Sequence, residues 1–171
     1  MKLESPAFSA NGAVPMIYTC DDQNISPPLR WDDAPVETQS YVLIVDDPDA
    51  PNRTFTHWVI YDLPPKTREL PEGISSVDPI LGGGGTQGTN DFGQIGYGGP
   101  CPPENHDAHR YFFKLYALRS VLGLAEGATK DQVEAAMDGQ ILTASELVGN
   151  YTRNPSGKGK RRKVTGQYDP E

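Results

Sequence analysis

The stretch at residues 40–63, SYVLIVDDPDAPNRTFTHWVIYDL, decides the fold. It contains two runs rich in β-branched and aromatic residues, 40–45 and 57–63, and this composition is typical of β-strands. Asp-Asp-Pro at 46–48 stops the first run, and Pro-Pro at 64–65 stops the second. Because each run is apolar on both of its faces, the stretch predicts two strands at the centre of a packed sheet.

Further strands and short helices are predicted on either side of this stretch. The aromatic run HRYFFKLYAL at 109–118 predicts a third long strand, and weaker strands are expected near residues 6–8, 14–18 and 29–31. Thr-Lys-Asp-Gln at 129–132 is typical of a capping box, so a short helix is expected to follow it and to end near Gly139. A second short helix is expected over residues 143–149.

Length and composition indicate one loop-rich domain. The chain has 171 residues, among them 18 glycines and 16 prolines, which together make about a fifth of it. This fraction is above the average of roughly 12% and below the roughly 25–30% at which disorder becomes the expectation. We therefore predict a single folded, β-dominated domain over residues 1–153, followed by a basic tail at 154–171.

The charge balance excludes several classes of protein. A net charge of −8 argues against non-specific nucleic-acid binding, which needs a basic surface. The basic run at 158–163 leaves a weak possibility of contact with nucleic acid or an acidic partner, but a solvated tail is the simpler interpretation. We expect no membrane insertion, because no apolar stretch approaches the ~18–20 residues of a spanning helix. No signal-peptide core is seen near the N-terminus, and the predicted location is cytoplasmic.

Cysteine usage favours reduced thiols. Cys20 and Cys101 are the only two cysteines, too few for a disulfide framework or a zinc quartet. A bridge between them stays open, but two reduced thiols in a cytoplasmic protein are the preferred interpretation. Cys101 is expected to be a small space-filling residue, because nothing adjacent in sequence would activate it.

Polar residues that could carry chemistry lie at the ends of the predicted strands. Asp47 and Asp49 follow the first strand, His57 opens the second, and His109 and Tyr111 lie on one face at the start of the third. If the first two strands are antiparallel neighbours, these five side chains converge at one end of the sheet. Arg110 takes the opposite face, where it could clamp a carboxylate of a neighbouring loop.

Such a group of residues suits an anion. Imidazoles, a phenol and backbone N–H groups are donors for a phosphate, while the carboxylates fix the histidine tautomers or receive an ammonium group. A metal site built from two histidines and a carboxylate is a weaker alternative, because the spacing matches no metal motif. A Ser-His-Asp hydrolase is weaker still, because G-x-S-x-G is absent. His106, in a loop, is expected to be merely exposed.

Two long motifs make the sequence resemble the phosphatidylethanolamine-binding protein family, in its prokaryotic Raf-kinase-inhibitor-like branch. The first is DDPDAP at 46–51 with THWV at 56–59, and the second is GYGGPCPP at 96–103 with HRY at 109–111. SPPLRW at 26–31 and NDFG at 90–93 support the match, which runs from about residue 4 to 153.

The resemblance implies an all-β fold, a Greek-key β-sandwich of two antiparallel sheets, with a few short helices towards the C-terminus. It also implies a small anion pocket at one end, walled by the GPCPP loop. Phe55 stands where many members have Trp, which keeps an aromatic wall but loses an indole N–H. The residues predicted to bind the ligand are Asp47, Asp49, Pro51, His57, Gly99, Pro100, Pro102, His109 and Tyr111, with Phe55 and Arg110 as structural support.

Three functions follow, in order of preference. The first is non-enzymatic binding of a small phosphorylated or anionic ligand, such as phosphate or a phosphoethanolamine-like head group, without a cofactor. The second is an inhibitor that docks its surface onto a kinase or serine protease, with the pocket as a switch. The third is a metal-dependent phosphoesterase.

Overall fold

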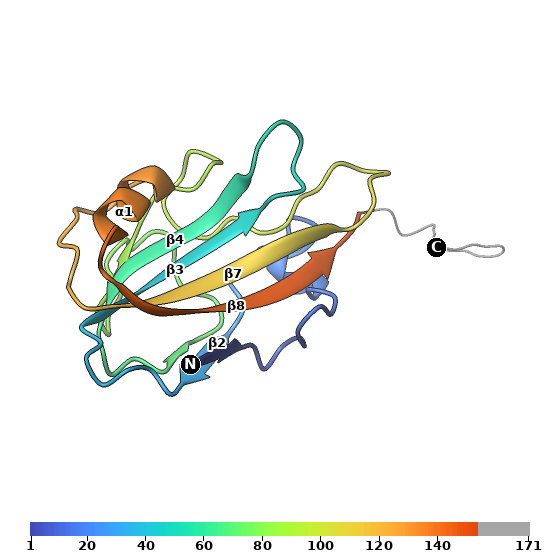
Figure 1. Ribbon diagram of the computed structural model, residues 1–171. Helices are drawn as coiled ribbons and strands as arrows, with labels where there is room; N and C mark the ends of the chain where they lie inside the picture. The colour runs from blue at the N-terminus through green and yellow to red at the C-terminus, as the bar shows by residue number, and fades with distance from the viewer. Residues whose placement is uncertain (154–171) are drawn as a thin grey trace, which may run out of the picture.

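The computed structural model describes residues 1–153, so the predicted basic tail at 154–171 lies outside the described residues. Its strands form two antiparallel sheets, as Figure 1 shows. The smaller sheet has the order β1-β2-β5, built from Lys2–Glu4, Leu29–Asp32 and Glu69–Leu70. The larger sheet has the order β6-β4-β3-β7-β8, built from Thr86–Gln87, Phe55–Leu63, Ser40–Asp47, His109–Leu118 and Ile141–Tyr151. The predicted β-sandwich is confirmed.

The central strands β3 and β4 of the larger sheet are buried on both faces, which explains their continuous apolar runs. Along β3, Leu43 and Val45 point into the core between the sheets, where they join Trp31 of β2. Ile44 points to the other side, into a second cluster with Val133 of helix α1 (Lys130–Met137). Full burial of such side chains contributes about 1.5–3 kcal/mol each, so this two-sided packing holds β3 at the centre of the fold.

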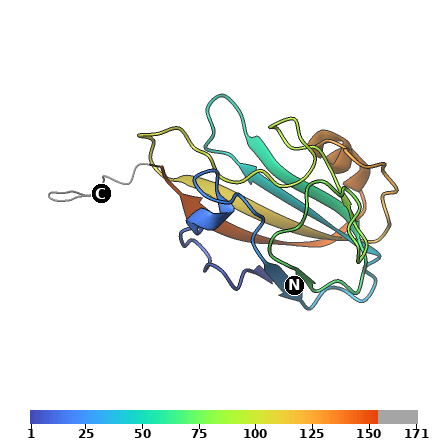
Figure 2. The same cartoon turned by 180° about the vertical axis from the view of Figure 1, so that it is seen from behind.

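Helix α1 begins at the predicted capping box. The Thr129 side chain accepts a hydrogen bond from the backbone N–H of Gln132, and the Gln132 side chain accepts one from the backbone N–H of Thr129. The helix covers the end of the larger sheet opposite the start of β7 and the end of β8 (Figure 1). A 3₁₀ turn, η1 (Met16–Tyr18), lies at the opposite end, which is visible from behind in Figure 2.

Three local predictions are wrong. Residues 143–149 belong to β8, because each of them pairs with a residue of β7, and this pairing overrides the weak helical pattern of the segment. Residues 6–8 form bends rather than a strand, and 14–18 end in η1. The strand expected near 29–31 is confirmed as part of β2. Among the described residues, no helix is long and apolar enough to cross a membrane.

The prediction of two reduced thiols is also wrong. Cys20 and Cys101 form a disulfide across 81 residues of sequence, with their Cα atoms 5.4 Å apart. Cys101 is therefore neither a free thiol nor a buried space-filling residue: it is disulfide-bonded and exposed. The pairing depends on η1 folding back against the 100–103 loop, a long-range contact that the sequence spacing does not reveal. The cytoplasmic location stays a prediction, and the reduced thiols no longer support it.

Candidate functional site

A pocket of about 210 Å³ opens at the end of the larger sheet where β3 ends and β4 and β7 begin. The β3–β4 connection and the loops around residues 92 and 101–103 complete its wall. Its lining residues are Asp47, Ala50, Pro51, Phe55, His57, Phe92, Cys101, Pro102, Pro103, His109 and Tyr111. The lining combines an apolar wall with a few polar side chains, which is the usual composition of a small-molecule site.

A β-bulge in β4 turns His57 toward this pocket. In the register with β3, Val45 faces Trp58 and Asp46 faces Thr56, so His57 is an extra residue. Trp58 packs in the core between the sheets, and His57 contacts the pocket residue Tyr111 with ring centroids 5.3 Å apart. Strict alternation would turn one of these neighbouring side chains away, so the bulge lets His57 serve the site while Trp58 serves the core.

The backbone of the glycine-rich loop fixes the tautomer of His57. Its Nδ1 lies 2.6 Å from the carbonyl oxygen of Gly98, so Nδ1 carries the hydrogen and donates it. The other ring nitrogen, Nε2, stays available to the pocket. Burial lowers the pKa of His57, an effect that the hydrogen bond to Gly98 and the charge of Asp47 only partly oppose. The neutral ring therefore presents Nε2 as a hydrogen-bond acceptor.

A buried carboxylate orients the second imidazole. Asp47 Oδ2 lies 2.7 Å from Nδ1 of His109, and both side chains are almost fully buried. The other carboxylate oxygen of Asp47 accepts the backbone N–H of Asp49 at 2.7 Å. On the far side of the ring, His109 Nε2 lies 3.4 Å from Nδ1 of His106. Asp47, His109 and His106 thus form a chain that leads from the pocket wall to the surface.

Tyr111 supplies the unpaired polar group of the pocket. Its side chain is 1% exposed, and its hydroxyl has no hydrogen-bond partner. Burial raises the pKa of this phenol, with a further contribution from Asp47, so the hydroxyl stays protonated and able to donate. A buried hydroxyl without a partner costs roughly 1–3 kcal/mol relative to a paired one, so a ligand oxygen in reach of it would gain that amount.

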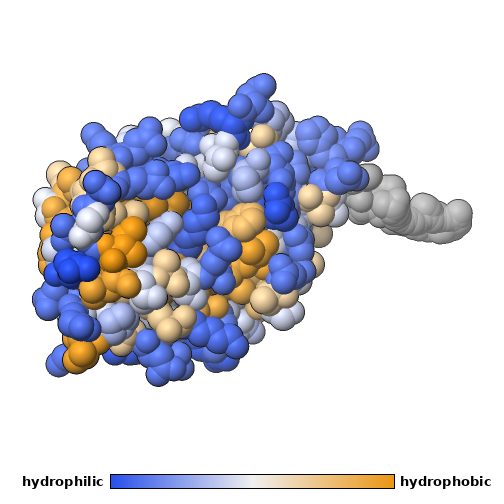
Figure 3. All heavy atoms as spheres, in the orientation of Figure 1, coloured by the Kyte–Doolittle hydropathy of each residue, from blue (hydrophilic) through white to orange (hydrophobic). Residues whose placement is uncertain are grey.

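Two phenylalanines form the apolar wall. Phe55 and Phe92 meet edge to face with ring centroids 4.8 Å apart, and Phe92 also contacts the His57 ring. A Cβ on Gly98 would lie 2.4 Å from the Phe92 ring, so only glycine leaves room for this arrangement. On the face seen in Figure 3, apolar side chains gather in separate patches. Phe92 is an exposed apolar residue that borders this pocket.

The structure brings together seven of the predicted site and support residues on the pocket wall: Asp47, Pro51, Phe55, His57, Pro102, His109 and Tyr111. Asp49 does not line it. Its carboxylate instead accepts hydrogen bonds from the backbone, Nε and Nη2 of Arg110, each at 2.9 Å. Arg110 therefore clamps a loop carboxylate from the opposite face of β7, as the alternation predicts.

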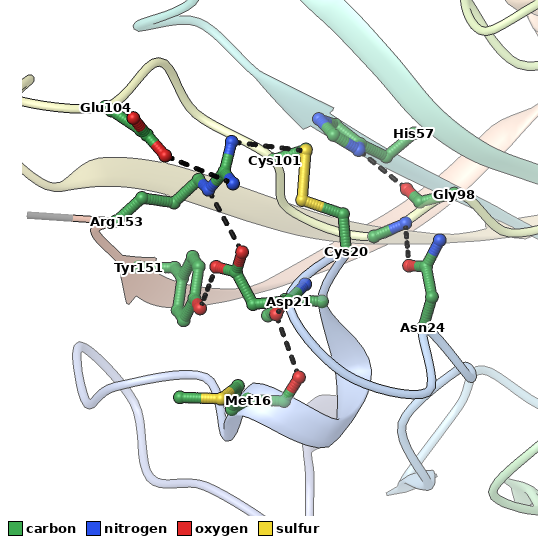
Figure 4. The surroundings of a disulfide bond; sticks show 12 residues. Met16, Cys20, Asp21, Asn24, His57, Gly98, Cys101, Glu104, Tyr151 and Arg153 are labelled. Carbon is green, nitrogen blue, oxygen red and sulfur yellow. Dashed lines mark hydrogen bonds and ion pairs between the residues drawn. A yellow bond between two sulfur atoms is a disulfide. The ribbon is translucent and has the colours of Figure 1, made fainter.

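Gly99 and Pro100 also lie behind the pocket wall and hold it in place. The N–H of Gly99 donates to Asn24 Oδ1 at 2.8 Å, and the carbonyl of Pro100 accepts from the N–H of Cys20 at 3.1 Å. Both hydrogen bonds lie beside the Cys20–Cys101 disulfide, whose surroundings are shown in Figure 4.

Sequence reasoning missed two residues that shape the site. In the sequence, Phe92 stands out only as part of the NDFG motif; its signal is a large aromatic side chain in a glycine-rich loop. His106 is exposed, as expected, but its contact with His109 gives it a place in the polar chain. Its signal is the spacing of three residues from His109 across a tight loop. Within residues 1–153, no cluster of three or more His, Cys, Asp or Glu side chains is arranged to hold a metal ion.

Fold and pocket together define a β-sandwich with imidazole, carboxylate and phenol groups gathered at one end of its larger sheet. The sequence profile of the phosphatidylethanolamine-binding protein family matches residues 4–152, and the chain belongs to this family. Proteins named UPF0098 from Aquifex aeolicus and Methanothermobacter thermautotrophicus are each 50% identical to it, and each match covers 90% of this chain and, respectively, 90% and 99% of the relative.

Two solved structures are similar in fold. The phosphatidylethanolamine-binding protein homologue CT736 of Chlamydia trachomatis superposes with a TM-score of 0.80 at 43% identity, covering 89% of this chain and 97% of that one. YbcL of Escherichia coli, described as a member of the mammalian family, gives a TM-score of 0.83 at 28% identity, covering 88% of this chain and 97% of that one.

Proposed function

We propose that this protein binds a small phosphorylated or otherwise anionic molecule in the pocket, without catalysing a reaction on it. The observation that carries the proposal is a preformed pocket lined by two imidazoles and by Tyr111, whose buried hydroxyl is a protonated donor without a partner. A ligand oxygen is the natural partner for such a group. His57 also lines the pocket, and its Nε2 is not used by the hydrogen bond to Gly98, so a ligand that carries both an oxygen acceptor and an O–H would satisfy both side chains.

The volume and lining of the pocket support a small head group rather than a large molecule. At about 210 Å³ the pocket is below the roughly 300–1,000 Å³ of sites that bury drug-sized ligands. Phe55 and Phe92 offer apolar surface beside the polar groups, so an anion with a short organic substituent fits the lining better than a fully hydrated ion. The family name of the relatives, which refers to a phospholipid head group, points to the same chemistry.

The charges also support a singly charged ligand. The Asp47 carboxylate accepts hydrogen bonds from the backbone N–H of Asp49 and from His109, so it repels an anion and offers the ligand no donor. A monoanion that still carries one proton, such as a monoprotonated phosphate ester, reduces this repulsion and can donate its own O–H to His57 Nε2. Affinity is therefore expected to favour monoanions over dianions.

The test compares two tyrosines on opposite faces of β7. Titration calorimetry with O-phosphorylethanolamine and with inorganic phosphate is expected to show saturable binding to the native protein, weakened about tenfold in Tyr111→Phe by loss of one hydrogen bond to a charged group. Tyr116→Phe, on the half-buried opposite face, is expected to bind like the native protein. Equal affinity in all three proteins, or no binding to the native one, would overturn the proposal.

A further inference from the structure

The chain contains three histidines, and all three gather at this end of the molecule. His57 and His109 line the pocket, whereas His106 lines an open groove beside it, together with Asp49, Asp107 and Arg110. His109 borders both spaces, so its ring separates the pocket from the groove. The ring nitrogens of His106 and His109, 3.4 Å apart, connect the two sides.

The hydrogen bonds define where protons can lie in this pair. Asp47 accepts from His109 Nδ1, so that nitrogen carries a hydrogen. In a neutral His109 ring, Nε2 then has only a lone pair, which Nδ1–H of His106 can meet. If the pair gains one proton, the charge can rest on His106, which keeps Nδ1–H directed at His109. Its own Nε2–H is then free for solvent.

An anion in the pocket creates a need for such a proton. Asp47 already places a carboxylate at the pocket wall, and the guanidinium groups at this end of the molecule are each bound to carboxylates: Arg53 to Asp91, Arg110 to Asp49, and Arg153 to Asp21 and Glu104. Several titratable or charged groups surround the histidine pair. On the pocket side they are Asp47 of β3, His57 of β4 and Tyr111 of β7. On the groove side they are Asp49 of the β3–β4 connection, Asp107 of the loop before β7 and Arg110 of β7, and beyond them lie Tyr151 of β8 and the ion pair of Glu104 with Arg153.

We infer that anion binding in the pocket is coupled to uptake of one proton by the His106–His109 pair, and that His106 is the residue that holds this proton. The inference rests on the proposed function. His57 is poorly suited to the role, because it is buried and a charge on it would be cut off from water, whereas His106 is exposed and its charge is solvated. Asp47 lies at the other end of the pair and stabilises the added charge across His109.

The probe is sulfate, because it stays a dianion over the pH range of the experiment and cannot bring its own proton. Titration calorimetry at pH 7.5 in two buffers of different ionisation enthalpy gives the number of protons taken up per sulfate bound. The native protein is expected to take up close to one proton. His106→Gln keeps a side-chain amide that can donate to His109 but cannot hold a proton, so it is expected to lose the uptake and about tenfold in affinity.

Two further variants separate proton holding from other roles. His106→Phe removes the hydrogen bond as well, and it is expected to lose the uptake and to bind no better than His106→Gln. Asn105→Gly changes the same loop at a residue with φ of 67°, a conformation glycine adopts readily, and it should keep both uptake and affinity. If His106→Gln retained native affinity and uptake, His106 would be only a neighbour of His109.

The remaining outcomes distinguish this inference from the proposed function. If the native protein binds none of sulfate, inorganic phosphate and O-phosphorylethanolamine, the proposed function fails and the inference fails with it. If it binds O-phosphorylethanolamine but not sulfate or inorganic phosphate, the proposed function stands and the inference fails. If it binds sulfate but the observed enthalpy, before any correction for buffer ionisation, is the same in both buffers, anion binding stands and the coupled proton does not. Uptake that persists in His106→Gln and disappears in His57→Gln would assign the proton to His57 and overturn the inference alone.

Discussion

Cys20 and Cys101 are joined by a disulfide that ties the loop after η1 to the wall of the pocket, where Cys101 itself lies among the lining residues (Figure 4). Around it, Arg153 contacts Asp21 and Glu104, and Tyr151 donates a hydrogen bond to Asp21. The end of β8, the loop after η1 and the loop at 100–103 are therefore held together at one point, and the pocket wall depends on it.

Removal of this disulfide is expected to destabilise the protein. A bridge that closes a loop of 81 residues restricts the unfolded chain by about 4 kcal/mol in the chain-entropy account. The double variant with Cys20→Ser and Cys101→Ser should therefore unfold at a clearly lower denaturant concentration than the oxidised protein. Equal midpoints would contradict the prediction, and the reduced native protein should match the double variant.

The interaction of Asp49 with Arg110 predicts a loss of stability in acid. The guanidinium hydrogen bonds lower the pKa of Asp49 below its ordinary value, so the folded state binds this proton more weakly than the unfolded state. The stabilisation is complete above the ordinary pKa of about 3.9 and is lost as the pH falls through the lower, folded-state pKa. Chemical unfolding from pH 6 to pH 2.5 is expected to show the native protein losing its advantage over Asp49→Asn below about pH 4. A constant difference across this range would contradict it.

The central strands and most of the pocket wall could be predicted from the sequence, because both depend on local patterns. The runs at 40–45 and 109–118 are apolar enough to specify strands, and antiparallel pairing then places Asp47, His57 and His109 at one end. Alternation along β7 also predicts the clamp between Arg110 and Asp49. These inferences need only the period of a strand and the direction of its neighbour.

The remaining features depend on contacts between distant segments, which composition does not encode. β8 carries small and polar residues that resemble a helix in isolation, and pairing with β7 decides its conformation. The bulge that turns His57 to the same side of the sheet as Trp58 follows from the register of β3 against β4. His106 meets His109 only through the shape of the loop between them, and its exposed position alone gave no sign of that contact.

His57 is expected to make stability depend on pH near neutrality. Its pKa is lowered by burial, so between that value and the ordinary value of about 6.5 the unfolded chain binds more protons than the folded one. Stability must then rise with pH through this window and fall as the pH drops below about 6.5. Urea unfolding at pH 7.5, 6.5 and 5.5 is expected to show this decline in the native protein and a smaller one in His57→Gln. Asn105→Gly, which changes an exposed residue without a titratable side chain, serves as the control, and a decline of equal size in all three proteins would refute the assignment.

Gly98 is expected to be the position at which the apolar wall is most easily broken. A Cβ there would approach Phe92 Cδ2 and Cε2 to 2.4 and 2.5 Å, so Gly98→Ala must push the ring away from Phe55 and His57. Overpacking of this kind destabilises by roughly 1–3 kcal/mol, and displacement of Phe92 removes part of the pocket wall. Gly98→Ala should thus lower both the unfolding midpoint and the affinity for O-phosphorylethanolamine.

Gly83→Ala is the matched control, because a Cβ at that glycine meets nothing within 4 Å. If both alanine variants behaved like the native protein, the Phe92 ring would not be fixed by Gly98, and the wall would have to depend on Asn90, whose side-chain oxygen accepts the backbone N–H groups of Phe92 and Gln94.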